Sequence, residues 1–228
     1  MSRTQRELKA LRQQQREEAA ARQRARDRRN LFIIAGVLGA AAVAILLVAL
    51  ALNQAANQAA KQAAANQLPF KAVSGTIGTA VPDEGRAHVD PSTTPTYKFY
   101  PPASGPHYSA TGIAPVPWKT IATSSSPLVE GQYIHNLEHG GMAILYNCST
   151  GADCTTLKNS LENYVTNLAP NEPTFKEVKV VITPYSQGMQ KKVALVAWDY
   201  IEFLDTYDQN AITQFYENHV DKGPEAIP

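Results

Sequence analysis

The hydrophobic positions of the chain are distributed unevenly, and the longest apolar run lies near the N-terminus. Residues 31–52, LFIIAGVLGAAAVAILLVALAL, are 22 consecutive residues without a charge or a proline. As an α-helix rising about 1.5 Å per residue, this run is about 33 Å long, enough to cross a hydrocarbon core of about 30 Å. It is apolar on every side, whereas a helix of a soluble domain carries a polar stripe. The pattern therefore predicts a transmembrane helix at residues 31–52.

The polar sequence on both sides of this run also favours helix. Residues 1–30 interleave Glu and Arg and contain no Gly or Pro, which predicts a charged helical segment. Residues 53–68 repeat short blocks of Ala, Asn, Gln and Lys, so we expect the membrane helix to continue as a stalk. A cleaved signal peptide has a shorter apolar region. The length of the run and its charged leader favour an uncleaved anchor, although the Ala-rich sequence after it leaves cleavage open.

The folded part of the chain is expected at residues 69–228. Its first half, up to residue 130, is rich in Pro, Gly, Ser and Thr, which predicts loops with short strands at residues 72–77 and 96–100. The rest alternates between strand-like and helix-like periodicity. The expected order is strand 132–135, strand 142–147, helix 155–168, strand 178–184, strand 192–200 and helix 210–220. We therefore predict an α+β domain with a mainly antiparallel sheet, two packing helices and a loop-rich N-terminal half.

The distribution of charge adds an orientation to this picture. Residues 1–30 hold ten Lys or Arg and four Asp or Glu, a net charge of +6. The remaining 198 residues hold 11 basic and 16 acidic residues, a net charge of −5. Because basic residues concentrate on the cytoplasmic side of membrane helices, we predict a cytoplasmic N-terminus and an extracytoplasmic C-terminal domain in a single-pass protein of the cell membrane.

The partners that these segments imply are lipids. Residues 31–52 would contact the bilayer, and the basic run RQRARDRR, from Arg22 to Arg29, would attract anionic lipid. Nucleic-acid binding is not expected, because this run has no interleaved aromatic residues and no nucleic-acid-binding motif. The sequence names no protein partner.

The chain has two cysteines, Cys148 and Cys154, with five residues between them. Outside the cytoplasm, an isolated close pair most simply forms a disulfide. A metal-binding thiol pair or a redox dithiol is the alternative, but the spacing is not the CxxC of redox motifs. We therefore predict a structural disulfide.

The segment YIHNLEHGG, residues 133–141, has the highest density of side chains that could bind a metal ion or transfer protons. It places His135, Glu138 and His139 within five residues. Two imidazoles and a carboxylate this close can bind a metal ion or transfer protons. The simpler interpretation is that these side chains hydrogen-bond backbone groups of a loop-rich fold.

The other three histidines are scattered along the sequence. His88 (in GRAHVD) and His107 (in SGPHY) lie in segments punctuated by Gly or Pro, where a rigid backbone can hold a site. His219 lies near the end of the last expected helix and is expected to face solvent. Each of these residues alone is more simply structural, but the pair at residues 135 and 139 needs a joint explanation. We therefore give a shared site and the structural interpretation equal weight.

The letters HNLEH also match H-x-x-E-H, which in inverted zinc peptidases lies on a helix, with both histidines on zinc and the glutamate as general base. Here Gly140 and Gly141 follow at once, and the strand-like MAILY comes after them. Because glycine disfavours helix, we expect a turn that enters a strand. The peptidase interpretation therefore receives little weight.

Three blocks resemble those of a bacterial extracytoplasmic family that is catalogued as a domain of unknown function, number 3105. They are DEGRAHVD (residues 83–90), TYKFYPPASGPHY (96–108) and YIHNLEHGGMAILYNC (133–148). The patterns PPxSGPHY and HxLEHG are long and unusual, and the resemblance is clear over residues 70–148. It implies a single-pass membrane protein, often actinobacterial, and brings no established activity. By position, the recurring polar residues of the family correspond to His88, His107, His135, Glu138 and His139.

The residue types suggest which metal such a site would hold. Imidazole and carboxylate ligands suit zinc or copper(II), and an added Met142 or Met189 would favour copper(I). Met142 alternates with the apolar residues that follow it, so it is also explained as a core residue. We predict a copper or zinc site formed by His107, His135 and His139, with His88 or Glu138 as a fourth group.

Two other functions are consistent with the sequence. In one, the domain is a non-catalytic interaction module of the cell envelope, with structural histidines and an aromatic recognition surface (Tyr97, Tyr100, Tyr108, Trp118 and Tyr133). In the other, it is a metal-dependent hydrolase or oxidoreductase with Glu138 as the base. The chain has no GxSxG, no P-loop and no GxGxxG after a predicted strand, which favours a non-enzymatic role.

Overall fold

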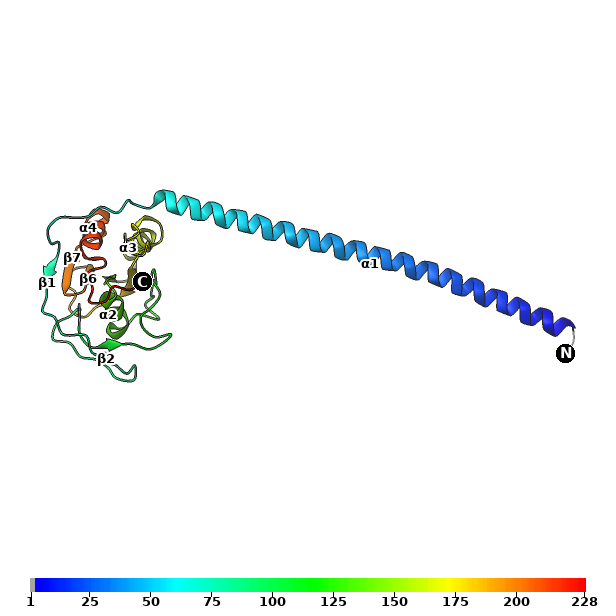
Figure 1. Ribbon diagram of the computed structural model, residues 1–228, viewed down its shortest axis with the longest axis horizontal. Coiled ribbons are helices and arrows are strands. Elements are labelled where there is room, and N and C mark those ends of the chain that lie inside the picture. Colours follow the sequence, from blue (N-terminus) through cyan, green and yellow to red (C-terminus); the bar gives the residue numbers. More distant parts are fainter. Residues whose placement is uncertain (1–2) are drawn as a thin grey trace. The chain divides into compact units, whose positions relative to one another are not determined.

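The computed structural model describes residues 3–228, apart from the side chains of residues 3–15, 17–21, 25 and 33. The chain divides into two compact units, Met1–Lys61 and Gln62–Pro228. Along the chain, the elements are α1 (Arg3–Asn66), β1 (Thr79–Ala80), β2 (His88–Val89), β3 (His107–Tyr108), α2 (Glu130–Glu138), β4 (Met142–Tyr146), α3 (Ala152–Asn163), the π-helical turn η1 (Tyr164–Leu168), β5 (Val180–Pro184), β6 (Val193–Ala197), β7 (Tyr200–Leu204) and α4 (Gln209–His219) (Figure 1).

Helix α1 is continuous over 64 residues and includes the charged leader, the apolar run and the Ala-rich segment (Figure 1). The predicted continuation of the apolar helix into the Ala-rich segment is confirmed. The large apolar side chains of residues 31–52 that the structure describes are exposed, Phe32 by 76% and Ile45 by 71%. In the described part of the chain, this is the helix long and apolar enough to cross a membrane.

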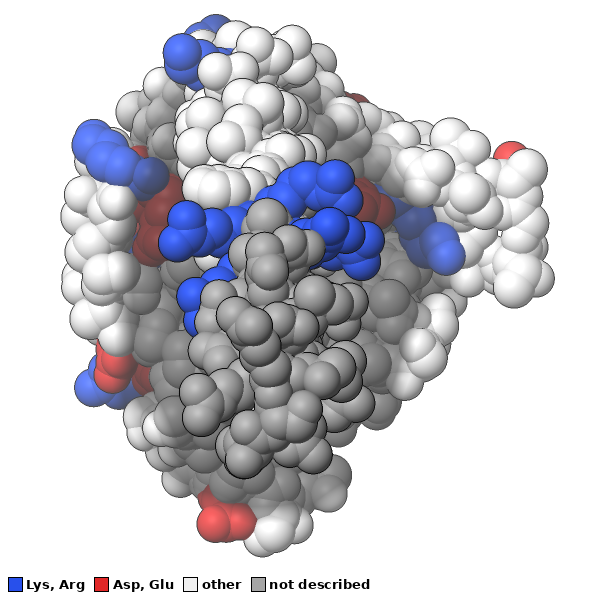
Figure 2. All heavy atoms as spheres, turned by 90° about the vertical axis from the view of Figure 1, so that its right-hand side faces the viewer, with Lys and Arg blue, Asp and Glu red and all other residues white. Residues whose placement is uncertain are grey.

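The basic side chains beside the apolar run are also exposed. They belong to Arg22, Arg24, Arg26, Arg28 and Arg29. Figure 2 shows blue Lys and Arg side chains gathered in the middle of a view along α1. An exposed basic cluster next to an apolar helix is the arrangement that attraction to anionic headgroups requires. Anionic lipid at Arg22–Arg29 stays a prediction.

The C-terminal unit is built on a five-stranded sheet with the order β1-β7-β6-β4-β5. All neighbouring strands are antiparallel except β4 and β5, which are parallel. The predicted α+β class with a mainly antiparallel sheet is therefore confirmed.

Consecutive residues of β4, β5 and β6 are buried. Because successive residues of a strand point to opposite sides, both faces of this part of the sheet are buried. On one face, Ile144 and Leu195 belong to a core that includes residues of α3 and α4, among them Leu161 and Phe215. On the other face, alternate strand residues pack with α2 and with the loops of residues 97–128 (Ala143, Leu145, Val181, Ala194 and Val196). The domain thus has three layers, and the loop-rich layer is the one that carries α2.

The predicted elements after residue 140 are largely confirmed. The strands at 142–147, 178–184 and 192–200 correspond to β4, β5 and β6, and the helices at 155–168 and 210–220 correspond to α3 with η1 and to α4. Strand β7 was not predicted as a separate element. It follows β6 after a tight turn in which Asp199 has a positive φ of 60°.

The predicted strands at residues 72–77 and 96–100 are wrong. Their backbone donors bond to side chains instead of to a neighbouring strand: Ile77 N donates to Asn218 Oδ1 at 3.0 Å, and Lys98 N donates to Glu84 Oε2 at 2.8 Å. A side-chain acceptor satisfies a backbone donor without a neighbouring strand.

The predicted strand at residues 132–135, and with it the turn expected at HNLEH, is also wrong, because these residues lie in helix α2. Tyr133, Ile134 and Leu137 have helical spacing and are fully buried. Gly140 and Gly141 do not prevent the helix but end it: Gly140 N donates to Leu137 O and Gly141 N donates to Asn136 O, each at 2.9 Å. This is the Schellman arrangement, and Gly140 has the positive φ (78°) that it needs.

The predicted disulfide is confirmed. Cys148 and Cys154 are joined, with an S–S distance of 2.02 Å, and the bond links the segment after β4 to the first turns of α3. Neither thiolate is therefore free to bind a metal.

Candidate metal centre

Two loop segments far from α2 in sequence supply the first two histidines. Strands β2 and β3 pair in parallel, with His88 directly opposite His107. The pairing extends through His107 N to Ala87 O at 2.9 Å and Gly105 N to Gly85 O at 2.7 Å. The GRAHVD and SGPHY segments thus form one short ladder that holds the two imidazoles side by side, with ring centroids 4.8 Å apart.

Helix α2 supplies the remaining groups. His135 and Glu138 are three residues apart, so they lie on the same side of the helix. The helix is held in place by Asn136, whose side chain accepts from Val116 N at 3.0 Å and donates to Val116 O at 2.8 Å. Tyr133 Oη also donates to Pro102 O, at 3.1 Å.

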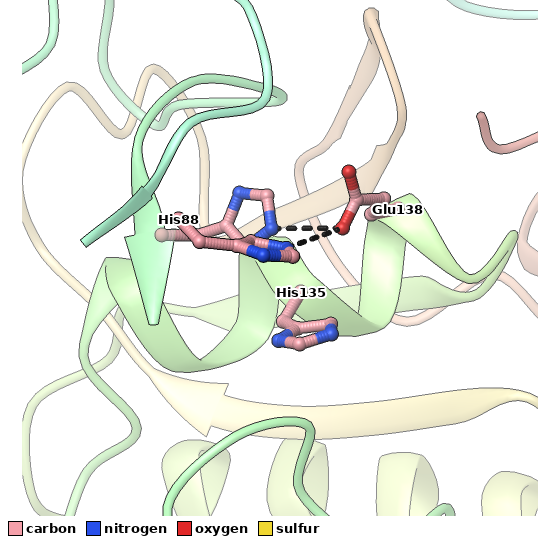
Figure 3. A group of neighbouring side chains, drawn as sticks. His88, His135 and Glu138 are labelled. Carbon is pink, nitrogen blue, oxygen red and sulfur yellow. Dashed lines mark hydrogen bonds and ion pairs between the residues drawn. The ribbon is translucent and has the colours of Figure 1, made fainter. Parts of the chain in front are cut away.

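Four side chains lie close together, and Figure 3 labels three of them, His88, His135 and Glu138. One ligand atom from each of His88, His107, His135 and Glu138 lies within 4.8 Å of all the others. Glu138 Oε2 is 2.9 Å from His107 Nε2 and 3.2 Å from His88 Nε2. His107, His135 and Glu138 are buried, whereas the side chain of His88 is 47% exposed. The cluster is thus enclosed on most sides and meets solvent at His88.

The hydrogen bonds of two rings determine which nitrogen faces the centre. His107 Nδ1 is 2.8 Å from Gly105 O, and His135 Nδ1 is 2.5 Å from Tyr108 O. A carbonyl oxygen only accepts, so both Nδ1 atoms carry the proton. Each neutral ring then keeps its lone pair on Nε2, which is the tautomer that a metal ligand needs.

The pKa shifts of His135 and Glu138 favour a neutral His135 ring and an ionised Glu138 carboxylate. Burial lowers the pKa of His135 below its usual value, against the hydrogen bond to Tyr108 O. Burial alone would raise the pKa of Glu138, but the hydrogen bond of His88 and the charge of His107 outweigh it and lower this pKa. An ionised carboxylate and a neutral imidazole are the forms that bind metal ions.

The short contact between His107 and Glu138 needs a cation between the two groups, which is either a proton or a metal ion. A neutral His107 with its proton on Nδ1 would present the lone pair of Nε2 to a carboxylate oxygen 2.9 Å away. Two acceptors at this distance repel each other unless a proton or a metal ion lies between them. Ligands about 2.1 Å from one ion are about 3.0–3.4 Å apart in octahedral and tetrahedral shells. The separations of 2.9 and 3.2 Å are close to this range.

His139 occupies a different position from the one expected. It is the C-cap residue of α2, and its ring contacts that of His135 with centroids 4.6 Å apart. Its ligand atom groups with Glu138 and Glu225 and not with the other three histidines. Burial first, and then the charge of His135, lower the pKa of His139 to about 4. The four-residue centre therefore contains both His88 and Glu138, which were expected as alternatives.

Glu225 was not predicted from the sequence as a residue of the site. It lies in the C-terminal segment KGPEAIP, and an isolated glutamate in such a segment carries no local signal of function. Only the preceding Gly223-Pro224 indicated a segment of fixed backbone.

Other expectations about side chains near the site are corrected. His219 does not face solvent: it is buried, and its Nε2 is 2.6 Å from Ile77 O. The aromatic residues expected as a recognition surface are buried or pack against the core, with Tyr133 fully buried. Met142 is a core residue on the α3/α4 face of the sheet, as its alternation indicated.

The H-x-x-E-H pattern does lie on helix α2, contrary to the expectation of a turn. Its glutamate nevertheless sits among the histidines, with Oε2 against His88 and His107. The two histidines of the pattern fall in different groups, His135 with His107 and His139 with Glu225. This differs from a peptidase motif, in which both histidines share one zinc and the glutamate stays off the metal.

The fold and the site together define a class: a protein with an N-terminal helix of membrane-spanning length and an α+β domain whose buried histidine–glutamate cluster could hold a metal ion. The chain belongs to the family described as protein of unknown function, DUF3105, whose model matches residues 88–227. The matched region contains every residue of both groups described above. No curated protein and no solved structure matches the chain.

Proposed function

We propose that this protein is a membrane-anchored, extracytoplasmic metal-binding protein that holds zinc or copper(II) through His88, His107, His135 and Glu138. The observation that carries the proposal is the anchoring of two buried imidazoles by Nδ1–H bonds to backbone carbonyls, which leaves Nε2 for a ligand beside the Glu138 carboxylate. Backbone acceptors of this kind orient metal-binding histidines in known sites.

The types of ligand atom restrict which metal ions the site can bind. Three imidazole nitrogens and one carboxylate oxygen suit zinc or copper(II). Copper(I) prefers thiolate and thioether ligands, but both cysteines are in the disulfide, Met142 lies in the core and Met189 packs against the other core cluster.

The arrangement favours binding over catalysis. Glu138 already contacts two histidines through Oε2, so it acts as a member of the donor set and not as a free base. Of the four groups only His88 is substantially exposed, which leaves little room for a substrate beside the ion. A hydrolase with Glu138 as the base is therefore the weaker alternative.

Metal retention by the full-length protein in detergent tests the proposal. After incubation with Zn²⁺ or, separately, Cu²⁺ and desalting, we expect at least about one ion per chain by plasma mass spectrometry. His107→Ala and His135→Ala should weaken the affinity on the order of 100-fold or more, because each removes a ligand nitrogen from the shared centre. His88→Ala should also weaken it, with the smallest effect on folding, since this side chain is half exposed.

A matched control separates ligand loss from damage to the fold. His219→Ala removes a buried histidine that also bonds a backbone carbonyl but lies outside the cluster, so it should keep wild-type metal content. Near-ultraviolet circular dichroism identifies variants that retain the native fold. A folded wild-type protein that binds neither ion at micromolar concentration would disprove the proposal.

The extracytoplasmic location is a separate prediction with its own test. The charge difference across residues 31–52 and the disulfide support it. In intact bacterial cells, a membrane-impermeant maleimide should label a Ser92→Cys variant and not a Ser2→Cys variant, whereas both should react after lysis. Labelling of Ser2→Cys and not of Ser92→Cys in intact cells would show the opposite orientation. This result would not bear on whether the site binds a metal ion.

A further inference from the structure

The carboxylate of Glu138 belongs to two groups of metal-binding side chains. One is the centre with three histidines, and the other contains His139 and Glu225, with all three ligand atoms within 4.8 Å of one another. Oε2 of Glu138 faces His88 and His107, and its second oxygen points away from them (Figure 3). Glu138 therefore offers its carboxylate to both groups, and a carboxylate can bind one ion through each of its two oxygens.

His139 is a buried imidazole whose ring makes no hydrogen bond with the described groups of the chain. Its side chain is 7% exposed, and its Nε2 lies 3.6 Å from Glu225 Oε2. This distance is too long for a hydrogen bond. Two ligands of a common ion, each about 2.1 Å from it, reach this separation when the angle between them is somewhat wider than tetrahedral. The ring of His139 thus faces Glu225 across a gap that is wider than a hydrogen bond, and a cation between the two groups would bind both.

Hydrogen bonds hold the C-terminal segment so that Glu225 lies at this position. Glu225 N donates to Glu138 O at 3.0 Å, and Asp221 N donates to Gly140 O at 2.9 Å. Lys179 Nζ donates to Ile227 O at 2.7 Å. Backbone bonds on both sides of Glu225 therefore attach the segment to the end of α2 and to the sheet.

Glycine makes this close approach feasible. A Cβ on Gly223 would lie 2.3 Å from Glu138 O and 2.4 Å from Gly140 N. A Cβ on Gly140 would lie 2.8 Å from the Asp221 Cα. The two backbones are in contact where Glu138 and His139 end the helix, and no side chain fits between them.

We propose that Glu138, His139 and Glu225 form a second divalent-cation position, so that Glu138 bridges two ions. The inference rests on the proposed function, because the bridge requires an ion in the three-histidine centre. Two carboxylates and one imidazole form a harder donor set than that centre, and zinc is a metal that both sets accommodate. Glu225 is 37% exposed, so this ion is the more exchangeable of the two. An ion bound at this position would link the C-terminal segment to helix α2.

The experiment measures zinc content and the order of the C-terminal segment together. Full-length protein in detergent is loaded with Zn²⁺, and we expect about two ions per chain, falling to about one in Glu225→Gln and in His139→Ala. Glu162→Gln, an exposed glutamate on α3, is the matched control and should keep two. Zinc should slow amide exchange of residues 221–227 in the wild type and in Glu162→Gln, but not in Glu225→Gln.

The outcomes distinguish this inference from the proposed function. One ion in the wild type, unchanged in Glu225→Gln and lost in His135→Ala, would overturn the second position and keep the first. No bound zinc or copper would overturn both. Two ions in both the wild type and Glu225→Gln would place the second ion elsewhere. This result would also refute the ion-mediated link between the C-terminal segment and α2.

Discussion

Lys179→Met is expected to lower the free energy of unfolding of the domain by about 3–5 kcal/mol, because it removes one partner of a buried ion pair. Lys179 is fully buried, and its Nζ lies 2.9 Å from Asp221 Oδ1. The same atom donates to His139 O at 3.2 Å and to Ile227 O at 2.7 Å. Methionine fills the volume of the stem but leaves a mostly buried carboxylate and two carbonyls without their donor.

Denaturation of the full-length protein in urea, followed by tryptophan fluorescence, measures this change. Both tryptophans, Trp118 and Trp198, lie in the C-terminal unit, so the signal reports on the domain and not on α1. Lys158→Met, which replaces an exposed lysine of α3, should change stability by less than about 0.5 kcal/mol. Adding Asp221→Asn to Lys179→Met should recover part of the loss by removing the unpaired charge. Equal stability of Lys179→Met and wild type would show that this pair does not hold the C-terminal segment.

Tyr133→Ala is expected to destabilise the domain by about 3–5 kcal/mol, the usual effect of removing a fully buried aromatic ring. The Tyr133 ring is 0% exposed and meets Tyr185 edge to face, with centroids 6.3 Å apart. Its hydroxyl bonds Pro102 O at 3.1 Å and so joins α2 to the loop that leads to His107. Loss of the ring should therefore loosen the metal centre as well as the core.

Tyr133→Phe is the matched control, since it keeps the ring and removes only the hydroxyl. We expect it to lose about 1 kcal/mol and to retain metal. The same urea titration measures both variants, and a chelator competition with Zn²⁺ reports the affinity. A metal affinity unchanged in folded Tyr133→Ala would show that the packing of α2 against this loop does not position the histidines.

The two predictions concern different contacts of helix α2. Tyr133 bonds Pro102 in the loop that leads to His107, whereas Lys179 bonds His139 O at the end of the helix and Ile227 O in the C-terminal segment that carries Glu225. The helix is therefore the element on which both candidate metal positions are assembled. A change at one of these contacts should affect mainly the ion nearest to it, apart from effects through the shared Glu138.

The sequence by itself determined the features that depend on neighbouring residues. A run of 22 apolar residues specifies a helix of membrane-spanning length, whatever the rest of the chain does. Cysteines six positions apart are near enough to pair, and the nearly continuous apolar runs of β4, β5 and β6 follow from burial of both sheet faces. The clustering of His135, Glu138 and His139 was visible for the same reason.

Only the tertiary structure decided how these side chains are grouped. Helix α2 forms because burial of Tyr133, Ile134 and Leu137 and the glycine cap outweigh local preferences that indicated a strand. His88 enters the centre through a strand pairing with a residue 19 positions away, and Glu225 approaches Glu138 across 87 positions. Such contacts depend on how distant segments pack, and no local pattern of hydrophobic and polar residues records that packing.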